Sequence, residues 1–181
     1  MKEISLNILD IAENSVKAGA TLTEITVNET DGTLTLKISD NGCGMTAETL
    51  KSVTDPFYTT RTTRKVGMGL PLLKMEAEQT GGTFGISSKA LSEYPEDHGT
   101  KVLAVFNKKH IDYTPLGDVA SSIVTLIQGH PDTDFLFMHT YRSNSVTLDT
   151  RELRGVLEGV PLNSYEVLCW INNFLKEEEM K

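Results

Sequence analysis

Apolar and polar residues alternate with two different periods in the first part of the chain, and the period changes from one predicted element to the next. Residues 4–18 carry apolar side chains every three or four positions, which is typical of an amphipathic helix, and Gly19 follows as a helix-ending residue. Residues 23–30 and 33–40 alternate with period two on either side of an Asp-Gly pair. This pattern predicts a β-hairpin directly after the first helix.

The same two periods predict further elements along the rest of the chain. We expect helices at residues 46–54, 70–82, 117–129, 150–158 and 164–178, and strands at residues 83–88, 100–106, 133–140 and 144–149. Residues 58–69 follow neither period, which predicts a loop. Because helices and strands alternate throughout, the expected fold class is α+β with a mixed, largely antiparallel sheet.

A change of composition near residue 108 divides the chain into two parts. Residues 109–116 combine charged residues with a proline, and this composition predicts a linker. We therefore expect a first domain at residues 1–108 and a small C-terminal α+β extension at residues 117–181.

The composition excludes several classes of protein. The 181 residues are 39% hydrophobic and 23% charged, which indicates a packed core. The net charge of −8 argues against a nucleic-acid partner. The N-terminus carries acids and amides and no apolar stretch approaches a membrane span, so we expect neither a signal peptide nor a membrane segment. Two cysteines, Cys43 and Cys169, make no disulfide framework and fit a cytoplasmic location.

Three groups of residues are candidates for chemistry, and the first is a polar stripe on the first helix. Asp10, Glu13, Asn14 and Lys17 share one helix face, which is the usual pattern of a solvated surface. The alternative is a site in which the Asn14 oxygen ligates Mg²⁺ and Asp10 orients or deprotonates a water or hydroxyl beside the ion.

The second group follows the strand that ends at residue 40. Asp40, Gly42 and Gly44 fit an ordinary turn, in which the glycines adopt positive φ. They also fit a site in which the carboxylate accepts a hydrogen bond from an exocyclic amine while a flat base lies against the glycine backbone.

The third group is a basic, glycine-containing segment just before a predicted helix. Residues 67–70 read Gly-Met-Gly-Leu, and Arg61, Arg64 and Lys65 lie immediately upstream. Free backbone N–H groups at a helix start favour an anion such as phosphate. The segment is not a Walker A loop, because no Gly-Lys-Ser/Thr follows.

The order and spacing of these groups closely resemble the GHKL superfamily of ATP-binding domains. The segments "DIAENSVKAGA", "DNGCGM", "DPFYTT" and "VGMGLPLLK" are similar to its N, G1, F and G2 boxes, and Gly99-Thr100 to its last shared pair. The resemblance covers roughly residues 4–106. It implies the Bergerat fold, a two-layer α/β sandwich shared by DNA gyrase B, mismatch-repair ATPases, sensor histidine kinases and anti-sigma kinases.

The resemblance also implies roles for individual residues, with ATP and Mg²⁺ as the expected ligands. Asn14 matches the Mg²⁺ ligand, Asp40 matches the carboxylate that binds the adenine amino group, and Phe57 would anchor an ATP lid at residues 58–66. The implied nucleotide-binding residues are Asn14, Lys17, Asp40, Gly42, Gly44, Met45, Phe57, Arg61, Lys65, Gly67, Met68, Gly69, Leu70 and Thr100. Asp10 is the candidate catalytic residue. The sequence departs from the family pattern at two positions: ATP-hydrolysing members carry a Glu where this chain has Asp10, and sensor kinases usually carry a glycine where it has Lys65.

The expected function is ATP binding followed by transfer of the γ-phosphate to a separate protein partner. Because the sequence opens on the N box, we expect no phosphoacceptor module before it, and His110 fits a linker better than an acceptor motif. The remaining histidines lack metal-ligand spacing and are expected on the surface or in loops. Two alternatives stay open: a slow ATPase whose lid closure drives dimerisation into a homodimer or partner release, and a non-catalytic ATP sensor.

Overall fold

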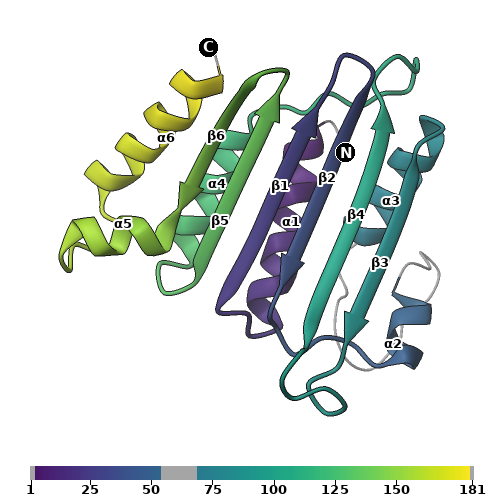
Figure 1. Ribbon diagram of the computed structural model, residues 1–181, viewed down its shortest axis with the longest axis horizontal. Coiled ribbons are helices and arrows are strands. Elements are labelled where there is room, and N and C mark those ends of the chain that lie inside the picture. Colours follow the sequence, from purple (N-terminus) through teal and green to yellow (C-terminus); the bar gives the residue numbers. More distant parts are fainter. Residues whose placement is uncertain (1–2, 54–68, 180–181) are drawn as a thin grey trace.

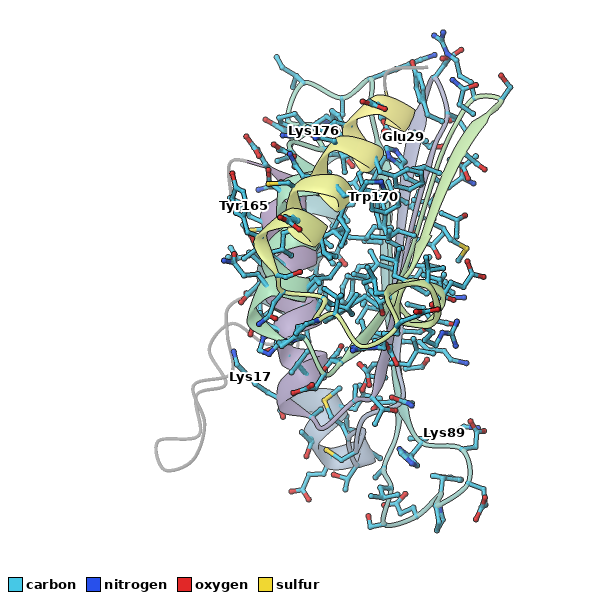
Figure 2. All side chains as sticks on the ribbon, turned by 90° about the vertical axis from the view of Figure 1, so that its left-hand side faces the viewer. Lys17, Glu29, Lys89, Tyr165, Trp170 and Lys176 are labelled. Atoms are coloured by element: carbon cyan, nitrogen blue, oxygen red, sulfur yellow. The ribbon has the colours of Figure 1, made fainter. Side chains whose placement is uncertain are left out.

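Six strands form one continuous sheet, and the helices α1, α3, α4 and α6 lie on one side of it (Figures 1 and 2). The structure is a computed structural model that describes residues 3–53 and 69–179. The elements in chain order are α1 (Ile4–Lys17), β1 (Leu22–Glu29), β2 (Thr33–Asp40), α2 (Ala47–Ser52), α3 (Gly69–Gln79), β3 (Thr83–Lys89), β4 (Gly99–Asn107), α4 (Val119–Gly129), β5 (Asp134–Tyr141), β6 (Asn144–Asp149), α5 (Thr150–Leu157) and α6 (Tyr165–Glu179).

The strand order is β3-β4-β2-β1-β5-β6, and every neighbouring pair is antiparallel except β1 and β5. The prediction of an α+β fold with a mixed, mostly antiparallel sheet is therefore confirmed. The predicted hairpin is the β1–β2 pair, and Gly19 ends the first helix with φ at 76°. Within the described residues, no helix combines the length and the apolar composition needed to cross a membrane.

The core lies between the sheet and its helices because alternate strand residues face the same side. Ile25 of β1 is paired with Ile38 of β2 and with Phe137 of β5, and all three side chains are buried. Ile8 and Ile11 of α1 belong to the same buried cluster. Fully burying such a side chain contributes roughly 1.5–3 kcal/mol, so this layer fixes how α1 lies across the central strands.

A buried polar pair joins α1 to α3. Asn7 Nδ2 donates a hydrogen bond of 2.5 Å to Glu76 Oε2, and both side chains are buried. Buried polar groups are costly without partners, so this contact restricts the position of α3 against α1. The last turn of α3 is thereby held against the buried side of α1.

The C-terminal part of the chain extends the sheet of the first part. β5 pairs in parallel with β1 over its whole length, and β6 pairs with β5 at the sheet edge (Figure 1). The division into residues 1–108, a linker at 109–116 and an extension at 117–181 stays a prediction. The two predicted parts share one sheet, because β1 of the first part pairs with β5 of the second.

Candidate functional site

Asp40 stands at the end of β2 and its carboxylate is held by three donors. Its Oδ1 accepts hydrogen bonds from the backbone N–H of Gly42 at 2.9 Å and of Thr100 at 3.3 Å. Its Oδ2 accepts one from the Ser15 hydroxyl at 2.7 Å. A carboxylate can accept about four hydrogen bonds, so Oδ2 keeps acceptor capacity for a further donor.

The glycines after Asp40 allow chain segments to approach closely. A Cβ added to Gly42 would lie 3.0 Å from Ala18 Cβ, and a Cβ added to Gly44 would overlap the carbonyl of Lys89. Gly44 also has φ at 62°, a conformation that side-chain-bearing residues rarely adopt. The structure therefore explains these glycines by backbone packing around Asp40, and their contact with a base stays a prediction.

Thr100 lies beside Asp40 and is joined to Met45 through one serine. Ser88 Oγ lies 2.8 Å from Thr100 Oγ1 and accepts a hydrogen bond of 2.8 Å from the Met45 backbone N–H. These contacts fasten the turn after β2 to the β3–β4 pair. The predicted site residues Asp40, Gly42, Gly44, Met45 and Thr100 therefore lie together.

Asp10 lies against the first residue of α3. A Cβ added to Gly69 would overlap the Asp10 carboxylate, so a larger residue there would displace this side chain from the helix start. Leu70 follows with its side chain buried in the core, which leaves its backbone as the part that could contact a ligand. The structure thus brings Asp10 to the N-terminus of α3, where free N–H groups attract anions.

The remaining residues of the polar stripe lie one and two turns further along α1. Asn14 is half-buried, and the exposed Lys17 has its Nζ 4.0 Å from Glu13 Oε2. That exposed i,i+4 pair is weak. Lys17 is therefore paired with Glu13, and no ion pair between Lys17 and Asp10 is formed in the described part of the chain.

Five predicted site residues fall outside the described residues. These are Phe57, Arg61, Lys65, Gly67 and Met68. The predicted lid at residues 58–66 lies outside them too. Within residues 3–53 and 69–179, no group of three or more His, Cys, Asp or Glu side chains is placed to hold a metal ion.

Three polar residues contribute to the site although the sequence did not single them out. Ser15 contacts Asp40, and Ser88 contacts Thr100. His98 Nδ1 lies 2.6 Å from the carbonyl oxygen of Gly42. Their partners are 25, 12 and 56 residues away, so no local pattern marks them. The expected surface or loop position of the histidines is wrong for His139, which is buried in β5.

A second polar cluster lies at the opposite end of β1, next to a cavity of about 330 Å³. Glu29 accepts hydrogen bonds from His139 Nε2 at 3.0 Å and from Lys108 Nζ at 2.6 Å. The hydrogen bond from His139 is the main cause that lowers the pKa of Glu29 below its ordinary value. Burial of the carboxyl raises this pKa, and the hydrogen bond and charge of Lys108 lower it further. Figure 2 places Glu29 toward one end of the sheet and Lys89 toward the other, where the Asp40 turn lies.

Comparison with known proteins identifies the class. Residues 2–110 match the family described as Histidine kinase-, DNA gyrase B-, and HSP90-like ATPase. The chain belongs to this family, and its first part is a GHKL ATP-binding domain. The resemblance seen in the N, G1 and G2 boxes is therefore confirmed.

Two of the similar curated proteins are bacterial sensor proteins. The chain is 30% identical over 88 residues to the sensor histidine kinase ZraS of Klebsiella oxytoca, covering 49% of this chain and 19% of that protein. It is 33% identical over 94 residues to the sensor protein SrrB of Staphylococcus aureus, covering 49% of this chain and 16% of that one. The chain thus spans less than a fifth of the length of these relatives.

Solved structures share the fold across most of the chain. The ADP-bound ATPase domain of Aquifex aeolicus MutL matches with a TM-score of 0.55 at 14% identity, covering 87% of this chain and 70% of that one. The N-terminal domain of a DNA repair protein matches with a TM-score of 0.56 at 14% identity, covering 82% and 53%. The prediction of the two-layer Bergerat fold is confirmed by this likeness.

Proposed function

We propose that the protein binds ATP with Mg²⁺ beside Asp40 and transfers the γ-phosphate to a separate protein partner. The observation that carries the proposal is the position of the Asp10 carboxylate, which lies against the start of α3 and is not neutralised by Lys17. A carboxylate in that position can act on a group that attacks a phosphate held at the helix N-terminus.

The adenine end of the proposed site is the fixed carboxylate of Asp40. Its Oδ2 accepts the adenine amino group, while Oδ1 stays occupied by the N–H groups of Gly42 and Thr100. Guanine carries a carbonyl oxygen at the corresponding position, and two acceptors facing each other would repel. The arrangement therefore favours adenine over guanine.

The phosphate end is formed by α1 and α3. The start of α3 lies against Asp10 of α1, and Asn14, one turn further along α1, is half-buried. An amide oxygen from Asn14 is a ligand of the type that Mg²⁺ accepts, alongside phosphate oxygens and water. Bound Mg²⁺ would neutralise the charge that builds up on the phosphates during transfer. Lys17 would add positive charge nearby.

Asp10 is the proposed catalytic residue. We infer that it accepts the proton of the attacking group while α1 and α3 hold that group and the phosphate in line. The sensor histidine kinase among the relatives supports transfer of the phosphate to a protein. The two cysteines without a disulfide framework support a cytoplasmic setting. The likeness to an ATPase domain supports the second candidate, a slow ATPase that closes its lid and forms a homodimer.

The decisive experiment follows the γ-phosphate. The protein is incubated with γ-labelled ATP and Mg²⁺, alone and with proteins encoded beside it, and the same is done with Asp10→Asn. Label on a partner that disappears with Asp10→Asn supports the kinase. Free phosphate without a labelled partner supports the ATPase. If neither a labelled partner nor free phosphate forms, the protein is a sensor that binds ATP without chemistry.

A further inference from the structure

The segment that joins β3 to β4 braces the turn after Asp40. Two consecutive carbonyl oxygens of that turn accept hydrogen bonds from it. The Cys43 oxygen accepts from the backbone N–H of Leu91 at 2.8 Å, and the Gly42 oxygen accepts from His98 Nδ1 at 2.6 Å. A carbonyl can only accept, so the proton of the imidazole is on Nδ1.

The His98 contact completes the fixation of Gly42. The N–H of Gly42 is bound to Asp40 Oδ1 at 2.9 Å, and its Cα has Ala18 packed beside it. The imidazole holds the carbonyl on the remaining side. Because glycine has more backbone freedom than any other residue, a contact to its carbonyl removes more alternatives than it would elsewhere.

We propose that His98 is a positioning residue for the adenine base. It holds the Gly42 peptide in the orientation in which Gly42 N–H engages Asp40 Oδ1, and this leaves Oδ2 directed at the base. The inference rests on the proposed binding of ATP beside Asp40. Without the imidazole, the turn must be ordered when the nucleotide binds, and the cost of that ordering is subtracted from the affinity.

Three substitutions test the hydrogen bond itself. The amide nitrogen of His98→Asn stands at the same distance from Cβ as Nδ1 and can still donate. His98→Asp has the same shape but presents an oxygen to the carbonyl, and His98→Ala presents nothing. We expect ADP to bind about threefold to tenfold more weakly to the Ala variant and more than about tenfold more weakly to the Asp variant, with the Asn variant within about twofold of the unsubstituted protein.

Calorimetry with ADP and with GDP supplies the readout, and the unfolding temperature without nucleotide is measured for each variant. A loosened Gly42 turn lowers the preference for ADP over GDP, which a general loss of stability does not do. His110→Ala is the matched control, since His110 lies in the loop after the opposite end of β4 and should leave both affinities unchanged.

Two results overturn the inference in different ways. If the Ala variant binds ADP as tightly as the Asn variant and keeps the preference over GDP, His98 has no positioning role and the proposed function stands. If the unsubstituted protein binds no ADP, the proposed function is wrong and the inference falls with it. The comparison of Ala with Asn decides the matter even if the Asp variant does not fold.

Discussion

Replacing Asp40 by Asn tests the nucleotide site with the smallest change of shape. The N–H groups of Gly42 and Thr100 both need an acceptor, so the new amide must place its oxygen at the Oδ1 position. Its NH₂ group then replaces Oδ2, where the Ser15 hydroxyl can turn and accept. The apo fold should therefore survive, while the oxygen that would accept the adenine amino group becomes a donor.

The expected loss can be worked out from the bonds involved. A hydrogen bond to a charged acceptor contributes about 1.5–3 kcal/mol, and an adenine amino group left facing a donor adds a further penalty. A total of about 2.7 kcal/mol corresponds to a roughly hundredfold weaker complex. At ADP near one hundred times the wild-type Kd, ligand stabilisation falls from about 2.7 kcal/mol to about 0.4 kcal/mol.

Thermal unfolding with and without ADP measures this difference. For a chain of this size 1 kcal/mol shifts Tm by about 2–4 °C, so a shift of about 5–11 °C should shrink to about 1 °C. Asp31→Asn is the control, because it removes the same charge from an exposed pair with Arg142 at the far hairpin. An unchanged ADP shift in the Asp40→Asn protein would show that the nucleotide does not bind there.

Two further predictions concern packing and pH. Gly69→Ala should lower the unfolding free energy in urea by up to about 1 kcal/mol, since its methyl group would force the Asp10 carboxylate into another rotamer. This loss should disappear in an Asp10→Ala background, and an equal loss in both backgrounds would contradict the overlap. Glu29 has a lowered pKa in the folded state, so its ionised form stabilises the fold above its ordinary pKa and this contribution is lost as pH falls through the folded pKa. Glu29→Gln should therefore be less stable than wild type at neutral pH and show a smaller drop in urea-unfolding free energy on acidification; the same drop in both proteins would contradict this role.

Local patterns were sufficient for the elements because each depends on residues close in the chain. The period of the apolar residues predicted α1, the β1–β2 hairpin, and the helices and strands of the C-terminal part to within a few residues. The boxes around Asn14 and Asp40 placed the chain in its family without a structure. Each of these signals is carried by residues that are close together in the chain, so it can be recognised without a structure.

Spatial partners were decided only by the tertiary structure. Periodicity cannot say that β5 pairs in parallel with β1, because a strand pairs through its backbone and any apolar strand would fit. The hydrogen bonds of Ser15 to Asp40 and of His98 to Gly42 join residues that are far apart in the chain. The sequence by itself determined that Asp40 stands at a glycine-rich turn after a strand. The fold decided which donors complete the binding of its carboxylate, because two of the three donors, Ser15 of α1 and Thr100 of β4, come from other segments that pack around it.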